Sequence, residues 1–221
     1  WSGKETLDSQ FSYAGQGLTG TMSSVIDLQR CAFVDRYHIG PSSGATGFDG
    51  QKAWEKETSG IATEQAGGDV RQLAVNEAYR GCNLWWHGDR AGARIQNNGR
   101  KTEGRKTFDV LTVTPRDGKP FDAWFDTVTH RLARTVEIQS IQVITTSYAD
   151  YTDVDGVPIA HTIVVDDGSG AANRQTMTLK STRVGPTRPA AYYALPITPL
   201  NDYALKGDKG ETAIRVRLVD N

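Results

Sequence analysis

The strongest constraint on the fold is a long run of alternating residues. Between residues 93 and 184, β-branched and aromatic side chains recur at every second position, and glycine, aspartate and asparagine interrupt them at short intervals. Strands joined by short turns pair with their neighbours in sequence and form an antiparallel meander. The alternation therefore predicts a mainly β fold, with a curved or half-closed antiparallel sheet.

The turn residues divide this region into strands. We expect a hairpin turn at residues 97–99, Asn-Asn-Gly, and further turns at 116–118, 155–156 and 166–168. The expected strands are 93–96, 105–114, 119–126, 131–138, 141–152, 157–165 and 175–184. Upstream, residues 11–21 and 22–39 predict two or three more strands, and a loop rich in serine and glycine follows residues 40–41.

One segment departs from the alternation. Residues 69–82 carry apolar side chains at three- and four-residue spacing, and Asp69 follows Gly67-Gly68 as a natural N-cap. Glu77 and other charged residues lie off this apolar stripe, whereas Cys82 lies on it. The pattern predicts one helix near 69–82, with Cys82 on its buried face.

The length and the prolines predict how the chain is organised. Its 221 residues suit one sizeable β domain, which we place at 1–185. Four prolines lie within the fourteen residues 186–199, so we expect an extended, loop-like cover there. Residues 211–219 alternate again as a lone strand, and we expect residues 186–221 to lead into a further domain.

Charge and hydropathy exclude two classes of partner. The formal net charge is -1, so the chain has no basic field to attract nucleic acid. No apolar run approaches the roughly 18 residues that span a bilayer. The two cysteines, Cys31 and Cys82, lack CxxC spacing and are either two buried thiols or one long-range bridge.

Catalytic and metal-binding motifs are missing from the sequence. The chain has no Asp-Thr-Gly or Asp-Ser-Gly triplet of an aspartic protease and no HExxH pair. A hydrolase would need an unrecognised dyad, for which His87 with Asp89 is the candidate. We therefore expect no catalytic residues, no metal and no cofactor in this chain.

The aromatic residues offer the only candidate binding site. A ligand pocket could lie between the helix and the concave face of the sheet, or the same rings could simply fill the core. The candidate pocket residues are Trp54, Tyr79, Trp85, Trp86, Trp124 and Tyr148. Trp85 and Trp86 cannot both point inward, so one should be exposed or covered by the proline-rich tail. We expect Trp54 to be first an inward anchor and second a pocket wall.

Three strings carry a resemblance to a known family. GFDGQKAWEKETSG, LTVTPRDGKPFDAWFDTVTHRLARTVE and SYADYTDVDGVPIAHTIVVDDG occur in this order, with the helix between the first two. Together they resemble the periplasmic lipoprotein carrier and receptor family. The resemblance implies a strongly curved antiparallel sheet wrapped around one or a few helices, and a periplasmic or secreted location. Such a location would permit the bridge between Cys31 and Cys82, which we expect.

A closer match is to the N-terminal region of bacterial exported proteins that carry a retropepsin-like aspartyl protease domain and often a PDZ domain. That resemblance implies a non-catalytic leading domain, which binds a hydrophobic or peptide-like ligand or positions the downstream protease domain. Two alternatives remain open. The chain is a purely structural spacer, or it is a hydrolase with an unrecognised site.

Overall fold

One large antiparallel sheet dominates the computed structural model, which describes residues 5–197, 206–207 and 210–211. Within these residues thirteen strands pair in the order β6-β5-β4-β3-β2-β1-β15-β14-β11-β10-β9-β8-β7. The strands are β1 (Thr6–Gly15), β2 (Leu18–Asp27), β3 (Phe33–Ile39), β4 (Ser42–Phe48), β5 (Ala53–Lys56), β6 (Ala62–Glu64), β7 (Arg94–Glu103), β8 (Lys106–Thr114), β9 (Phe121–Asp126), β10 (Leu132–Gln139), β11 (Gln142–Ala149), β14 (Thr162–Asp166) and β15 (Gln175–Gly185). Two short hairpins, β12 (Thr152–Val154) with β13 (Val157–Ile159) and β16 (Lys206–Gly207) with β17 (Gly210–Glu211), stand apart from it.

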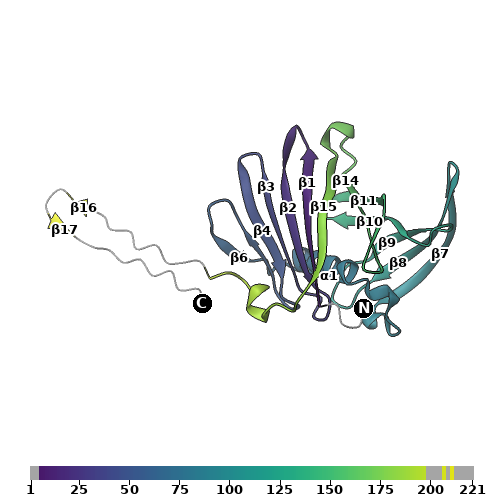
Figure 1. Ribbon diagram of the computed structural model, residues 1–221, viewed down its shortest axis with the longest axis horizontal. Coiled ribbons are helices and arrows are strands. Elements are labelled where there is room, and N and C mark those ends of the chain that lie inside the picture. The colour runs from purple at the N-terminus through teal and green to yellow at the C-terminus, as the bar shows by residue number, and fades with distance from the viewer. Residues whose placement is uncertain (1–4, 198–205, 208–209, 212–221) are drawn as a thin grey trace.

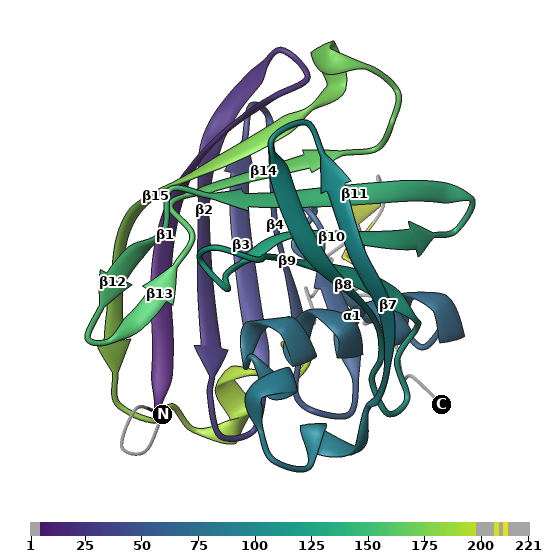
Figure 2. The ribbon, with the colours of Figure 1, turned by 90° about the vertical axis from the view of Figure 1, so that its right-hand side faces the viewer.

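The sheet curls strongly around one α-helix. Figure 1 shows α1 (Gly68–Gly81) against the sheet, and Figure 2 shows the sheet turning from β3 and β4 behind to β7 and β8 in front. Short 3₁₀ turns follow the helix at η1 (Leu84–Trp86) and η2 (Arg90–Gly92), and two more lie at η3 (Ala171–Asn173) and η4 (Ala190–Tyr192). The predicted fold class, a mainly β half-barrel wrapped around a helix, is confirmed.

One pairing joins distant ends of the chain. β1 pairs with β15 from Thr6 opposite Gly185 to Gly15 opposite Gln175. β1 also pairs with β2, so it connects the β2–β6 meander to the half of the sheet that ends at β7. The meander expected beyond residue 93 is present, but this long-range pairing was not predicted, because alternation shows only which neighbours pair.

One expected strand and one expected turn are wrong. Residues 11–21 are not one strand, because Gly15 pairs with Leu18 across a two-residue hairpin loop. Residues 97–99 are not a hairpin turn. They form a bulge within β7, where the Asn97 Oδ1 atom accepts a hydrogen bond from the Gly99 N–H at 2.8 Å. The hairpin closes instead between Glu103 and Lys106.

Two further boundaries differ from the prediction. Residues 157–165 divide into β13 and β14, and only β14 joins the large sheet. The segment expected to be a loop after residue 41 is strand β4. A Cβ atom at Gly47 would lie 2.3 Å from the Trp54 ring, so glycine is required where the indole crosses β4. Gly47 therefore makes room for the Trp54 side chain within a strand.

The two faces of the β2–β5 region are buried by different partners. On the inner face Phe33, Phe48 and Ala53 pack against Ala74 and Ala78 of α1. The outer face is covered by the segment after β15, in which Tyr193 is 1% exposed. This cover packs on Val25, Val34 and Trp54.

The expected strand at 211–219 lies outside the described residues from 212 onward, and the domain boundary at 185/186 stays a prediction.

The helix begins one residue earlier than expected. Its N-cap is Gly67, with no side-chain cap, and Asp69 lies in the first turn. The Asp69 carboxylate pairs instead with the Lys119 ammonium group and accepts a hydrogen bond from the Ser140 N–H at 3.2 Å.

At the C-terminal end of α1, Cys82 is buried and forms a disulfide with Cys31, with Cα atoms 5.8 Å apart. The structure therefore has the bridged form of the two cysteines.

Candidate functional site

A large cavity lies between the concave face of the sheet and α1. Its volume is about 1320 Å³. Ligand sites in proteins commonly enclose about 300–1,000 Å³, so this space is sufficient for a sizeable organic molecule. Side chains of β1, β2, β3, β11, β14 and β15 line it on the sheet side, and α1 and η1 line it on the helix side. The cavity is the candidate functional site.

The sheet wall of the cavity is mostly apolar. Because successive side chains of a strand point to opposite faces, the lining residues of each strand lie mainly at alternate positions. Directly opposed pairs on this face include Leu7 with Ile26 and Phe11 with Met22. Farther along the sheet, Ile163 lies opposite both Tyr148 and Met177. The wall is therefore continuous across the β1–β15 junction.

Polar loops and a small hairpin surround part of the same space. Residues 129–131, in the turn between β9 and β10, line the cavity, as do residues of the β12–β13 hairpin. The Arg131 guanidinium carbon lies 5.1 Å from the centre of the Tyr151 ring, which also lines the cavity. The Tyr151 hydroxyl donates a hydrogen bond to the Leu132 carbonyl at 2.7 Å.

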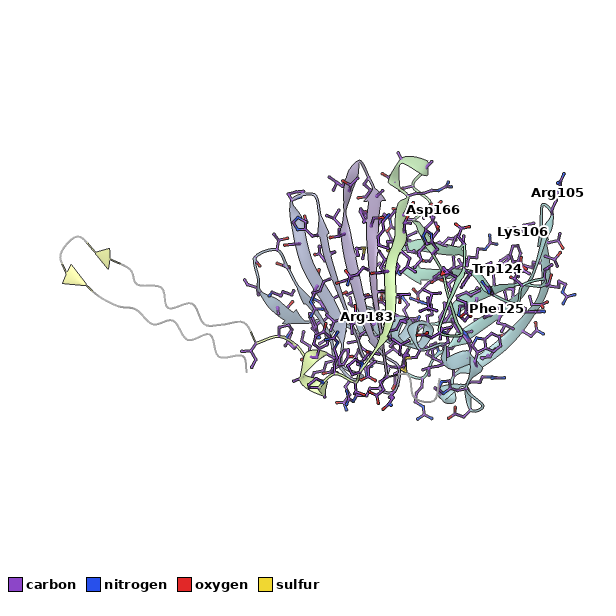
Figure 3. All side chains as sticks on the ribbon, viewed as in Figure 1. Arg105, Lys106, Trp124, Phe125, Asp166 and Arg183 are labelled. Carbon is purple, nitrogen blue, oxygen red and sulfur yellow. A yellow bond between two sulfur atoms is a disulfide. The ribbon has the colours of Figure 1, made fainter. Side chains whose placement is uncertain are left out.

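Three of the six predicted aromatic residues line the cavity. They are Trp85, Trp86 and Tyr148. Trp85 is 4% exposed and packs edge-on against Phe125, whereas Trp86 is 64% exposed. The prediction that one of the two tryptophans is exposed is confirmed. Figure 3 locates Phe125, another lining residue, on β9.

Trp54 does not line the cavity. Its side chain lies on the outer face of β5, where its Nε1–H donates a hydrogen bond to the Tyr193 carbonyl at 2.7 Å. Its neighbour Ala53 takes the inner face, because adjacent residues of a strand point in opposite directions. Trp54 is thus a buried anchor, as the sequence favoured, but it lies on the outer face beneath the proline-rich cover and is not a wall of the pocket.

Trp124 and Tyr79 are also absent from the cavity wall. Trp124 points to the opposite face of β9 from Phe125, where the Arg134 guanidinium carbon lies 3.7 Å from the centre of its ring. Tyr79 is buried behind Trp85, with ring centres 5.8 Å apart, and donates a hydrogen bond to the Arg90 carbonyl. Both residues fill the core, in agreement with the alternative that the sequence left open.

Two carboxyl groups meet at the wall of the cavity. Asp35 on β3 and Glu77 on α1 both line it, and the two side chains are hydrogen-bonded to each other. Burial raises the pKa of Asp35, and the hydrogen bonds with Glu77 and Ser24 oppose the rise. The Glu77 side chain is exposed to the cavity, but desolvation by the surrounding protein and the neighbouring Asp35 raise its pKa well above the usual value.

An ion pair lies beside these carboxyl groups. The Arg80 guanidinium, one helical turn from Glu77, contacts the Glu137 carboxylate at 3.1 Å. Glu137 is 5% exposed and also accepts hydrogen bonds from the side-chain amides of Asn76 and Gln139. Arg80 lines the cavity. Glu77 and Arg80 therefore place charged groups on the helix side of the site.

The sequence pattern did not predict the carboxyl groups at the cavity wall. Asp35 follows Phe33 at the two-residue spacing of inward positions, which was a usable signal. Glu77 lies off the apolar stripe of the helix. It is exposed, but it faces the cavity, because the curled sheet covers a second side of α1.

The remaining predicted features do not form a site. His87 and Asp89 are both exposed, and the Asp89 carboxylate accepts a hydrogen bond from the Ala91 N–H at 3.0 Å. Among the described residues, no cluster of histidine, cysteine, aspartate and glutamate could hold a metal ion. In the same residues, no helix is long and apolar enough to cross a membrane.

Comparison with known proteins identifies the fold. No protein-family model matches the chain, and no curated protein matches it by sequence. Similar solved structures include a LolA superfamily protein from Nitrosomonas europaea, with a TM-score of 0.59 and 12% identity over 88% of this chain and 91% of the other. A DUF1329 family protein from Desulfovibrio piger has a TM-score of 0.57 and 10% identity over 87% and 91%. A putative outer membrane lipoprotein-sorting protein domain from Vibrio parahaemolyticus has a TM-score of 0.52 and 10% identity over 81% and 85%. These similarities show a LolA-like fold.

Proposed function

We propose that this chain is a non-catalytic binding domain that holds a hydrophobic or amphipathic ligand in the cavity between α1 and the curved sheet. The observation that carries the proposal is the cavity itself, about 1320 Å³ in volume and walled by apolar side chains from both halves of the sheet. A purely structural spacer would fill this space with interlocked side chains at the density of a protein core. The large cavity supports the binding domain over the spacer.

The fold supports the same ligand class. One similar structure is named a putative outer membrane lipoprotein-sorting protein domain, and another belongs to the LolA superfamily. By analogy with lipoprotein sorting, we propose that the preferred ligand of this protein carries a long apolar chain. A periplasmic or secreted location is part of the proposal, because disulfides such as Cys31–Cys82 persist in oxidising compartments.

A matched pair of variants on β11 tests the cavity. Ile144 lines it, whereas the adjacent Val143 points to the other face and is 53% exposed. The wild-type protein should bind decanol saturably, as followed by the fluorescence of Trp85 and Trp86. Ile144→Asp should weaken binding about tenfold or more, because it places a charge in the apolar wall. Val143→Asp should bind like the wild type.

The control for folding is the thermal unfolding midpoint of both variants, measured without decanol. Equal decanol affinities for folded Ile144→Asp and Val143→Asp would place the ligand outside the cavity. Failure of the wild-type protein to bind decanol at all would contradict the proposal.

A hydrolase remains a second candidate because of one observation. Burial raises the pKa of Asp35, and burial together with the neighbouring Asp35 raises the pKa of Glu77; raised carboxyl pKa values at a cavity wall are a common feature of general acid–base catalysis. Hydrolysis of p-nitrophenyl decanoate distinguishes the two functions. A binding domain predicts the same rate for the wild-type and Glu77→Gln proteins, whereas a hydrolase predicts a large loss in the variant.

The expected position ahead of an aspartyl protease domain stays a prediction. It rests on sequence resemblance, and the lone strand that would lead into that domain falls mainly on residues outside the described ranges. In a protein with both domains, the cavity domain would present or position the substrate. Comparing peptide cleavage by the full-length protein with and without residues 1–185 would test this role.

A further inference from the structure

The carboxyl pair of Asp35 and Glu77 forms no ion pair with a neighbouring guanidinium, although the charge of Arg80 opposes the rise in the pKa of Glu77. The Arg80 guanidinium is the nearest cation on α1, but it forms its ion pair with the buried Glu137 carboxylate. Arg36, next to Asp35 on β3, points to the other face and donates a hydrogen bond to the Tyr192 hydroxyl at 2.9 Å. Neither guanidinium forms an ion pair with Asp35 or Glu77.

The hydrogen bonding of Asp35 is incomplete. Its Oδ1 atom is buried, and no described residue donates a hydrogen bond to it. A buried acceptor without a donor costs about 1–3 kcal/mol, and two carboxylates in contact repel each other. A proton shared between the two carboxyl groups removes the repulsion and leaves the pair with one negative charge. A ligand cation can then neutralise that charge.

Glu77 is the member of the pair that a ligand can reach. Its side chain is exposed, whereas the Asp35 Oδ1 atom is buried. Ser24, which hydrogen-bonds Asp35, lies opposite it across β2 and β3. The next inward pair on the same strands is Ile26 opposite Phe33, and both side chains line the cavity. A charged group at Glu77 therefore has apolar surface directly beside it.

We propose that Asp35 and Glu77 form a head-group subsite, which binds the primary ammonium group of an amphipathic ligand whose apolar part fills the cavity. Glu77 contacts the ammonium group, and Asp35 positions the Glu77 carboxyl from behind. This inference rests on the proposed binding function and names the chemistry of the ligand's polar end. An ammonium group suits the site because it offers three donors and a full positive charge.

Three ligands with the same apolar chain test the subsite: decylamine, decanol and decanoate. At pH 8 the wild-type protein should bind decylamine at least about tenfold more tightly than decanol, which corresponds to about 1.4 kcal/mol. Decanoate should bind more weakly than decanol, because its carboxylate would meet a negative charge. Titration calorimetry or tryptophan fluorescence measures all three affinities.

The variant Glu77→Gln keeps the shape of the side chain and removes its charge. It should bind decylamine and decanol with affinities within about threefold of each other. Glu57→Gln is the matched control, since Glu57 is an exposed residue outside the cavity lining. It should keep the preference for the amine. Asp35→Asn is the second variant, for use if Glu77→Gln does not fold.

A pH profile provides a readout that a structural role would not change. Binding of the ammonium group requires at least one ionised carboxyl, so decylamine affinity should fall once the pH drops below the raised pKa values of both Glu77 and Asp35. Decanol affinity should stay constant. The other charged or titratable groups at this end are Arg80 on α1, Glu137 on β10, Tyr148 on β11 and Arg36 on β3.

The possible outcomes separate the two proposals. If decanol binds and decylamine binds no better, the subsite is wrong and the binding function stands. If both folded variants keep the preference for the amine, the subsite is also wrong. If none of the three ligands binds the wild-type protein, the binding function fails and the subsite fails with it.

Discussion

At the scale of single residues, the contact between Asp35 and Glu77 has consequences for stability as well as for binding. The two carboxyl groups come from different elements and meet only in the folded chain. In the unfolded chain both side chains are solvated and titrate near their ordinary values. The folded protein therefore binds protons at these positions more tightly than the unfolded chain does.

This difference predicts how stability depends on pH. A carboxyl group with a raised folded-state pKa contributes stability that is complete below its unfolded pKa and is lost as the pH rises through the folded pKa. The wild-type protein should therefore gain stability relative to Glu77→Gln as the pH is lowered from 8 toward 5. Thermal unfolding midpoints of the two proteins across this range measure the difference.

Carboxyl groups with lowered pKa values change the pH dependence of stability in the opposite direction. Their contributions cancel when the wild-type protein is compared with Glu77→Gln. The hydrogen bond with the Lys119 side chain lowers the pKa of Asp69, and hydrogen bonds with Thr129 and Val128 lower the pKa of Asp126. Both groups are unchanged in Glu77→Gln. The exposed variant Glu57→Gln should give a difference that does not vary with pH. A wild-type advantage that grows toward pH 8 would contradict the predicted sign.

At the same scale, the sequence predicted which side chains are buried better than it predicted the face on which they lie. Trp54 was expected to be an anchor because it stands alone among charged neighbours, and it is buried. Its location on the outer face could not be predicted, because that face is covered by Tyr193, a residue 139 positions away. The inward position of Glu77 also depends on strands far from the helix in sequence. Local patterns identify which residues are apolar, whereas long-range pairing determines what surrounds them.

At the scale of elements, the disulfide ties the end of α1 to the loop between β2 and β3. That loop is itself tightly held, since the Asp27 carboxylate accepts hydrogen bonds from the N–H groups of Gln29 and Arg30 and pairs with the Arg30 side chain. Ile26 and Gly81, near the two ends of this connection, both line the cavity. The bridge therefore supports the position of the helix against the cavity wall.

Removing the bridge should destabilise the protein. The two cysteines are 51 residues apart, and closing a loop of this length in the unfolded chain typically contributes about 2–4 kcal/mol. Reduction should lower the free energy of unfolding of the wild-type protein by about this amount, as measured in denaturant. The Cys31→Ala, Cys82→Ala double variant should not respond to the reductant. Two alkylated thiols in the unreduced protein would show that the bridge is absent.

Turns were the least predictable elements. Asn-Asn-Gly at 97–99 favours a hairpin turn in isolation, yet β7 continues through it because Arg100 pairs with Asp109 on β8, and their side chains form an ion pair. Conversely, the serine and glycine residues of β4 resemble a loop, but the Trp54 ring and the Tyr37 hydroxyl occupy the space beside Gly47 and Gly44. In both cases contacts between strands override the local preference.

At the scale of the whole molecule, the cavity results from the closure of β1 on β15. Without this pairing, the apolar residues of β1 and β2 would not face those of β11, β14 and β15 across one continuous wall. The fold class could be predicted from alternation and the resemblance to lipoprotein carriers. The cavity could not, because it depends on a pairing between the two ends of the β region.

The central claim is that an apolar ligand lies between α1 and the concave face of the sheet. The most direct measurement is an NMR titration of the ¹⁵N-labelled protein with decanol, which follows the indole N–H signals after assignment with Trp→Phe variants. Trp85 and Trp86 line the cavity, whereas Trp54 and Trp124 do not. We predict saturable shifts of the Trp85 and Trp86 signals, with those of Trp54 and Trp124 unchanged. Shifts confined to Trp54 or Trp124, or no shifts at all, would contradict the claim.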